Sequence, residues 1–167
     1  MLTQDRLKEL LHYDPLTGQF IRIAKVARKT VIGSVAGYVD KSHGYVSLSV
    51  DGKEYYGHRL AWLYMTGAWP THTVDHHDRN RANNRFLNLR PATRTQNNQN
   101  MSVHEGREMH SAHKGVTWHK GGNRWMAQIN ANGKHYYLGL FSNELDAADA
   151  YTQAAKRLHG EFATDGL

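Results

Sequence analysis

The sequence predicts an α+β protein made of two small domains, the second of them a three-stranded antiparallel sheet packed on one helix. Three observations support this fold class. Apolar residues follow strand or helix spacing only over short segments, Asp-Gly and Asn-Gly turns join several of these segments, and a polar stretch at 102–110 separates two parts of different charge. We therefore expect a first domain at 1–102, a linker at 103–112 and a second domain at 113–167.

The first domain begins with an expected helix and an expected strand. Leucines recur at helical spacing over residues 2–12, and Thr3 is placed to accept a hydrogen bond from the first turn, so this segment predicts a short amphipathic helix. Residues 18–23 predict a strand after it.

A hairpin and a second helix follow in the first domain. Residues 44–56 predict two strands that turn at an Asp-Gly pair, residues 51–52, a combination typical of tight hairpins. Residues 58–66 predict a helix, which Gly67 ends and Pro70 prevents from resuming.

The second domain is expected to be a meander of three strands followed by one helix. Its strands are predicted at residues 115–118, 125–129 and 136–140. Asn132 and Gly133 form another tight turn between the second and third strands. Asn143 is placed to cap a helix that ends at Gly160, and its alanines form a small-residue face that packs closely on a sheet.

The composition excludes several classes of protein. The chain has no cysteine, which excludes disulfide scaffolds, thiolate zinc fingers, iron–sulfur clusters and cysteine nucleophiles. Its longest apolar run, 60–65, is far shorter than the roughly 20 residues of a membrane helix. The first residues of the chain include acids, whereas a signal peptide begins with a positively charged region and an apolar run. We therefore expect no membrane partner and a cytoplasmic location.

The charge indicates a polyanionic partner. Lys and Arg number 21 against 15 Asp and Glu, for a net charge of +6, and the first 102 residues carry 14 of these bases against 8 acids. From residue 109 in the linker to residue 143 in the second domain the chain contains no acid, and acids return only at the start of the expected helix. The expected sheet is therefore basic and the start of the helix acidic.

Residues 75–98 concentrate the side chains that phosphodiester hydrolysis requires. Histidines supply a base for water, Asp and Asn supply oxygen ligands for a hard cation, and five arginines supply positive charge for a phosphate backbone. Carboxylate and amide oxygens favour Mg²⁺ or Mn²⁺ over a closed zinc site. Taken singly, each asparagine is more typical of a turn and each arginine of a solvated surface.

The order and spacing of these residues resemble a known family. The segment VDHHDRNRANNRFLNLRPATRTQNNQN, residues 74–100, is similar to the phage and intron-borne HNH endonucleases, and the resemblance extends over 37–101. It implies a ββα-metal fold, with its core at about 70–101, in which a hairpin and a helix hold one divalent cation.

The resemblance assigns roles to four residues. His76 matches the general base that activates water, and Asn88 matches the central Asn, which fixes the hairpin and the orientation of the histidine. Asp75 and Asn97 match the ligands of one Mg²⁺ or Mn²⁺ ion. The arginines of the segment are then candidates for DNA contacts: Arg79, Arg81, Arg85, Arg90 and Arg94. Arg85 and Arg90 have the alternative role of holding the loop together.

Three points leave alternatives open. His77 stands where relatives usually carry an aliphatic residue, so it is a core residue, a partner of the site or a rival base. Asn98 is the alternative to Asn97 as ligand. Asp75 and His76 are neighbours that a strand normally points to opposite faces, which a bulge or the end of the strand would resolve.

The second domain has its own resemblance. Residues 113–164, HKGVTWHKGGNRWMAQINANGKHYYLGLFSNELDAADAYTQAAKRLHGEFAT, are similar to the APETALA-type, ethylene-response-factor DNA-binding domain, whose sheet enters the major groove. The residues placed to reach DNA are Trp118, His119, Lys120, Arg124, Trp125, Gln128 and Lys134. For the two tryptophans, packing in the core is the alternative.

Together these features predict a phage-encoded, site-specific DNA endonuclease of the homing type, acting on double-stranded DNA in the cytoplasm of a bacterial host. No small-molecule substrate is expected. One site cuts one strand, so the monomer should nick, and a double-strand break needs a homodimer or two visits. The alternatives are a catalytically inert DNA-binding regulator and a sequence-tolerant phage nuclease.

Overall fold

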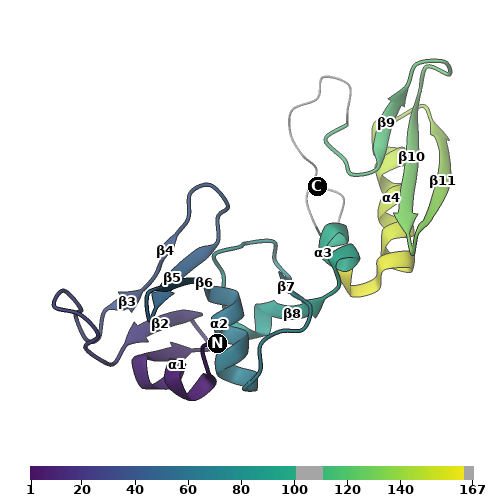
Figure 1. Ribbon diagram of the computed structural model, residues 1–167. Coiled ribbons are helices and arrows are strands. Elements are labelled where there is room, and N and C mark those ends of the chain that lie inside the picture. Colours follow the sequence, from purple (N-terminus) through teal and green to yellow (C-terminus); the bar gives the residue numbers. More distant parts are fainter. Residues whose placement is uncertain (101–110, 164–167) are drawn as a thin grey trace. The chain divides into compact units, whose positions relative to one another are not determined.

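The computed structural model of the chain describes residues 1–100 and 111–163 (Figure 1). It mixes α-helices with small antiparallel sheets, and its contacts divide it into two compact units, Met1–Arg94 and Thr95–Leu167. Each unit is described by itself. The predicted linker at 103–112 lies outside the described residues, apart from its last two positions.

The first helix, α1 (Gln4–Leu10), is capped as predicted. The Thr3 side chain accepts a hydrogen bond from the backbone N–H of Arg6 at 3.2 Å. The predicted helix was too long, because Leu11 begins strand β1 (Leu11–Asp14). Burial alternates along β1 and its backbone pairs with β2 (Gln19–Arg22), so sheet hydrogen bonds replace the last helical turn.

Two three-stranded sheets make up most of the first unit. One has the order β1-β2-β3, where β3 is Val35–Ala36. The other has the order β4-β5-β6, formed by Tyr38–Val39, Val46–Val50 and Lys53–Tyr56. The predicted hairpin between β5 and β6 is confirmed, and its two turn residues, 51 and 52, both have positive φ, as a type I′ turn requires. Strands β3 and β4 are two residues long, too short to leave a pattern in the sequence.

Helix α2 (Gly57–Thr66) follows β6 directly and packs into the core of this unit. It buries Leu60, Ala61 and Leu63 beside residues of β1, β2 and β5. Gly67 ends it in the left-handed conformation, with φ of 78° and its N–H donating to Leu63 O, as predicted.

A two-stranded antiparallel ribbon completes the first unit. Strand β7 (Thr73–His76) pairs with β8 (Leu89–Ala92), and a long loop at 77–88 joins them, ending in the short 3₁₀ helix η1 (Phe86–Asn88). Helix α3 (Arg94–Asn100) comes next in the chain, and the division between the units falls at its start.

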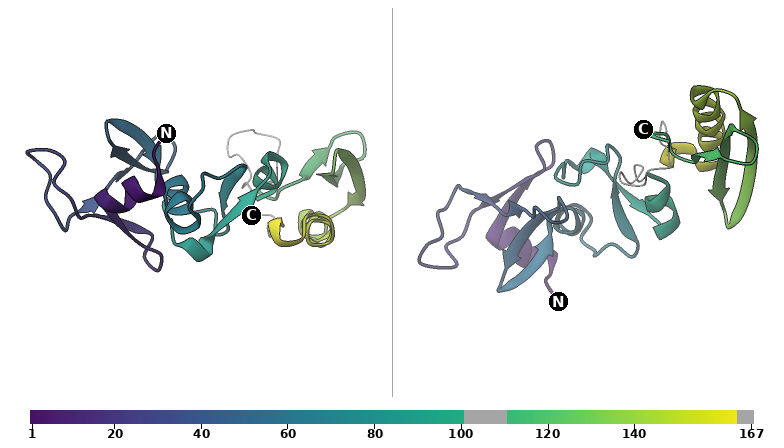
Figure 2. Two further views of the ribbon diagram at one scale, coloured as in Figure 1. Left: turned by 60° about the horizontal axis from the view of Figure 1, so that its bottom comes forward. Right: turned by 90° about the horizontal axis from the view of Figure 1, so that it is seen from above.

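The second unit contains the predicted meander and helix. Strands β9 (Val116–His119), β10 (Arg124–Ala131) and β11 (Lys134–Phe141) form an antiparallel sheet of order β11-β10-β9. Helix α4 (Glu144–His159) lies along one face of it (Figure 2). Asn143 caps α4 as predicted, accepting a hydrogen bond from the Leu145 N–H at 2.9 Å. The chain then turns into the short 3₁₀ helix η2 (Gly160–Phe162).

None of the helices in the described ranges is both long and apolar enough to cross a membrane.

Candidate active site

Asp75 and His76 occupy the end of strand β7. Asp75 is the cross-strand partner of Arg90 and His76 that of Leu89, in a register without a bulge. Neighbours on a regular strand point to opposite faces. His76 is the last residue of β7, so the end of the strand, and not a bulge, is the irregularity found here.

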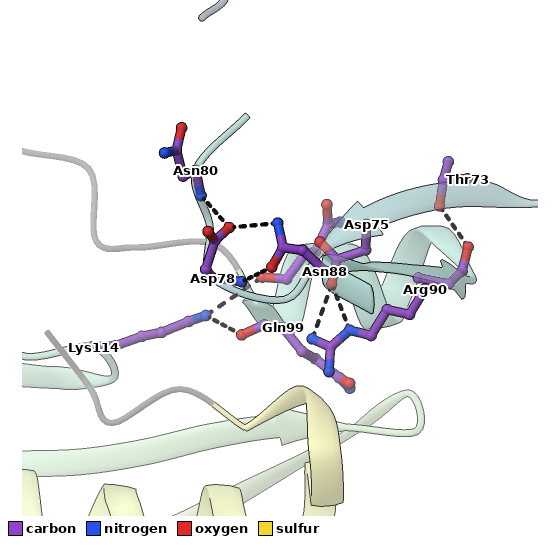
Figure 3. A network of polar contacts seen from close by, with 10 residues as sticks. Thr73, Asp75, Asp78, Asn80, Asn88, Arg90, Gln99 and Lys114 are labelled. Carbon is purple, nitrogen blue, oxygen red and sulfur yellow. Dashed lines mark hydrogen bonds and ion pairs between the residues drawn. The ribbon is translucent and has the colours of Figure 1, made fainter. Parts of the chain in front are cut away.

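The Asp75 carboxylate is buried and ion-paired. It is 5% exposed, and both Nε and Nη2 of Arg90 lie 2.9 Å from its Oδ2 atom (Figure 3). Charge-assisted contacts of this kind are strong when water is excluded. Arg90 therefore fixes Asp75, which agrees with the alternative role of holding the local structure together.

His76 is enclosed by polar and aromatic groups. It is 4% exposed, and its Nε2 lies 3.1 Å from Oδ1 of Asn84. Its ring packs against His58 edge-on, with centroids 5.1 Å apart, and against Tyr45 at 5.9 Å. Burial lowers the pKa of His76 more than the hydrogen bond to Asn84 and the nearby carboxylates raise it. The imidazole is therefore neutral near pH 7, the form that can accept a proton.

Asn88 ties the 77–88 loop together. Its Nδ2 donates to Oδ1 of Asp78 at 2.9 Å and to the backbone oxygen of Asn83 at 2.8 Å, while its Oδ1 accepts from the Asp78 N–H at 3.0 Å (Figure 3). Partial burial acts to raise the pKa of Asp78, but hydrogen bonds from Asn83 and Asn88 bring it below its ordinary value. Asp78 therefore stays charged and anchors the loop.

The side chain hydrogen-bonded to His76 is Asn84, which was not among the predicted site residues. Asn84 is the second asparagine of the Asn-Asn-Arg run and is 2% exposed. The predicted partner, Asn88, bonds within the loop. The two adjacent asparagines, 83 and 84, were a signal that an amide lies near the histidine. The sequence does not show which of the two faces it.

Exposure distinguishes several other candidates. His77 is exposed, which removes the alternative of a core residue. Its backbone N–H donates to the backbone oxygen of Asn88 at 2.9 Å. On α3, Asn97 is half-buried and Asn98 is exposed. The exposed arginines of the segment are Arg79, Arg81, Arg85 and Arg94.

Arg81 is held in place although it is exposed. Its Nη1 donates to the His43 backbone oxygen at 2.9 Å, and its guanidinium carbon lies 5.1 Å from the centre of the Tyr45 ring. Tyr45 also contacts His76, so Arg81 presents its charge close to the candidate base.

In the second unit, the tryptophans lie on the side of the sheet that α4 covers. Trp118 and Trp125 are cross-strand partners with ring centroids 5.1 Å apart, and Trp125 packs against the cluster that contains Val116, Ala127 and two alanines of α4. This position favours the alternative that the tryptophans are core residues. Lys120, Arg124 and Lys134 are exposed, as DNA-contacting side chains must be.

Comparison with known proteins identifies both parts of the chain. A family model for HNH endonucleases matches residues 55–99. An uncharacterized HNH endonuclease of Acanthamoeba polyphaga mimivirus is 33% identical over 135 residues, which cover 80% of this chain and 67% of that protein. This chain belongs to the HNH endonuclease family. Protein 3.8 of Escherichia phage T7 is 32% identical over 108 residues, covering 64% of this chain and 86% of that protein.

The second unit of this HNH endonuclease matches a different model. An AP2 domain model covers residues 111–161. APETALA2-like protein 2 of Oryza sativa subsp. japonica is 47% identical over 55 residues, which are 32% of this chain but only 12% of the rice protein. Both predicted resemblances, to HNH endonucleases and to the APETALA-type domain, are thereby confirmed.

The donor types of the predicted metal ligands fit a hard cation. Asp75 offers carboxylate and Asn97 amide oxygen, the ligands that Mg²⁺ and Mn²⁺ take along with water and phosphate oxygens. Within residues 1–100 and 111–163, no group of three or more His, Cys, Asp or Glu side chains is placed to hold a metal ion.

The face of the C-terminal sheet opposite α4 carries two residues that were predicted to reach DNA, Arg124 and Gln128, and further side chains that the prediction did not include. On β10, these two residues, Met126 and Asn130 alternate with residues that face α4. Their neighbours on β11 include Tyr137, which is 59% exposed, and His135, whose Nδ1 lies 2.9 Å from Asn130 Oδ1. The alternation along β10 was the signal that predicts these positions.

Proposed function

We propose that this HNH endonuclease is a divalent-metal-dependent, site-specific DNA endonuclease of the homing type that nicks one strand per active site. The observation that carries the proposal is His76, a neutral histidine held at the end of β7 directly after the candidate ligand Asp75. The AP2 match and the exposed Lys and Arg side chains of the C-terminal sheet support recognition of double-stranded DNA by the second unit.

In the proposed reaction, His76 takes a proton from a water molecule, whose oxygen bonds to phosphorus. The bond between phosphorus and the 3′ oxygen breaks, and that oxygen leaves with a proton from solvent. A cation on Asp75 and Asn97 would supply positive charge to the phosphate and the departing oxygen. Arg79, Arg81 and Arg85, all exposed, neutralise the DNA backbone beside the cut.

The first test is cleavage of supercoiled plasmid, ideally carrying phage DNA, with Mg²⁺ or Mn²⁺. We expect open circles that disappear with EDTA, and a rate for His76→Ala reduced by about 10²–10⁴-fold. DNA binding by His76→Ala should persist in a gel shift. His77→Ala is the matched control, since His77 is exposed and adjacent, and it should cut at nearly the original rate.

Other outcomes identify the alternatives. Plasmid that is shifted on a gel but never cut with any divalent ion would overturn the catalytic proposal and leave a DNA-binding regulator. A second outcome is that the plasmid is cut, but the preference for one site is lost when nonspecific competitor duplex is in excess. That result would indicate a sequence-tolerant nuclease instead of a homing enzyme. If His77→Ala abolishes cutting and His76→Ala does not, the base is His77.

The setting of this activity is also a proposal. Relatives in phage T7 and in mimivirus support a viral gene, whose product would act on DNA in the cytoplasm of an infected host. A double-strand break would then require a homodimer or a second visit, which linear plasmid products would reveal.

A further inference from the structure

Asn84 contacts the candidate base from inside the protein. We propose that Asn84 is a positioning residue that fixes the tautomer of His76, so that Nε2 keeps the hydrogen and Nδ1 accepts the proton from water. The inference rests on the proposed function only in taking His76 as the base. The contact itself, Nε2 to Oδ1 at 3.1 Å, is independent of any activity.

The chemistry of the two groups decides the tautomer. A neutral imidazole carries one N–H, and an amide oxygen can only accept, so an Nε2 that faces Oδ1 must be the protonated nitrogen. The lone pair of His76 then lies on Nδ1, on the other side of the ring. Ring packing against Tyr45 and His58 fixes the plane of the imidazole, and Asn84 fixes which nitrogen serves as the base.

Asn84 is itself held from three directions by the first 57 residues of the chain. The hydroxyl of Tyr13, on β1, donates to the Asn84 backbone oxygen at 2.6 Å. A Cβ at Gly18 would lie 2.5 Å from the Asn84 carbonyl carbon, so the turn after β1 presses on the same backbone. A Cβ at Gly57, the first residue of α2, would lie 2.6 Å from Nδ2 of the amide.

These contacts give the N-terminal segments a specific task. Three elements that carry none of the predicted catalytic residues converge on one asparagine, which is 2% exposed. The amide cannot move toward Gly57 without displacing backbone, and the backbone that carries it is packed against Gly18. Its oxygen is therefore presented to His76 in one place, as a group that orients a catalytic base must be.

The decisive measurement is the tautomer of His76 in the full-length protein, without DNA or metal. Long-range ¹⁵N–¹H correlation NMR near pH 8 should show a single Nε2–H tautomer, with its labile hydrogen protected from exchange with solvent. Asn84→Leu, which keeps the size but removes the acceptor, should lose the protection. Asn84→Asp, which restores an acceptor of the same shape, should regain it.

Cleavage should follow the same order. With saturating DNA, kcat of Asn84→Leu should fall by about 10–100-fold with KM little changed, and Asn84→Asp should recover most of the loss. Asn80→Leu is the matched control for loosening the loop, because Asn80 bonds to the Ala82 N–H and not to His76. It should keep both the protected signal and nearly the original kcat.

A second variant leaves Asn84 in place. Gly57→Ala adds a methyl group where the amide lies, while alanine favours the helix that starts there. We expect weaker protection of the Nε2 hydrogen and a lower kcat in a protein that still folds, as amide dispersion in the same spectra will show.

Two results would overturn the proposal. A wild-type spectrum with the hydrogen on Nδ1 would mean that Asn84 presents its amide nitrogen instead of its oxygen. A protected Nε2–H that survives in Asn84→Leu would mean that another group holds the ring. Failure of the proposed function is distinguishable, since an inactive wild-type protein with the predicted NMR pattern contradicts the nuclease and leaves the positioning contact intact.

Discussion

The two units differ in how far their candidate functional side chains are exposed to solvent. Near the end of β7, Asp75, His76 and Asn84 are at most 5% exposed and each has a partner at hydrogen-bond distance. On the uncovered face of the C-terminal sheet, Arg124 and Tyr137 stand open to solvent, and the core behind them is largely small alanines of α4. Chemistry needs groups fixed in one geometry, whereas binding to a phosphate backbone needs groups that reach it.

This difference has energetic consequences. A buried charge that loses its partner is left without water or counter-ion, which costs several kcal/mol. An exposed charge that is removed costs little stability, usually within about 0.5 kcal/mol. The same substitution should therefore destabilise the first unit and spare the second, while the second loses DNA affinity.

The largest effect is expected from Arg90→Met. This change keeps the length of the side chain but removes both contacts to Asp75 Oδ2, leaving a buried carboxylate. We expect the first unit to lose about 3–5 kcal/mol of unfolding free energy, measured by urea-dependent hydrogen exchange of amides in β7 and β8.

Arg124→Met is the matched control on an exposed strand. It should change the stability of the second unit by less than about 0.5 kcal/mol. If Arg90→Met is equally harmless but weakens DNA binding, then Arg90 is a phosphate contact and the contrast between the units is wrong.

The next effect is a dependence of stability on pH. Burial lowers the pKa of His58 to about 3, from an ordinary value of 6.5, and the neighbouring His76 imidazole and Arg59 guanidinium act in the same direction. Below pH 6.5 His58 binds a proton in the unfolded chain but not in the folded one. The unfolding free energy therefore falls as the pH falls. By pH 5 we expect a loss of about 2 kcal/mol from His58 alone. Hydrogen exchange of α2 amides at pH 7 and pH 5 measures it.

His58→Gln should flatten this dependence, because glutamine does not titrate. His12→Gln, at an exposed position, should leave it unchanged. An equal slope in the wild-type protein and in His58→Gln would show that His58 is charged in the folded state, contrary to its burial.

The smallest effect should appear in DNA binding by Arg124→Met. Loss of one phosphate contact reduces the slope of log Kd against log salt by about 1 and weakens binding several-fold. Cleavage at saturating DNA should be unaffected. Fluorescence anisotropy with labelled duplex at several salt concentrations measures the slope, and an unchanged slope would place Arg124 away from the backbone.

Local patterns predicted the elements that depend on neighbours in the chain. The hairpin at 51–52, the end of α2 at Gly67 and the meander with α4 all follow from turn residues, caps and spacing. The end of α1 was predicted wrongly, since Leu11 fits a helical pattern equally well and its strand exists only because β2 pairs with it. The choice between a longer helix and a strand at Leu11 depends on pairing with β2, which the local sequence pattern does not show.

For the site, the sequence by itself determined the family: the order and spacing of Asp75, His76 and Asn88 resemble the HNH endonucleases, a family that the comparisons confirm. Only the tertiary structure decided which groups touch. The hydrogen bond from Tyr13 to Asn84 joins residues 71 positions apart, and the contact between His58 and His76 likewise links α2 to β7. Such partners are chosen by how buried surfaces pack together, which spacing along one segment cannot encode.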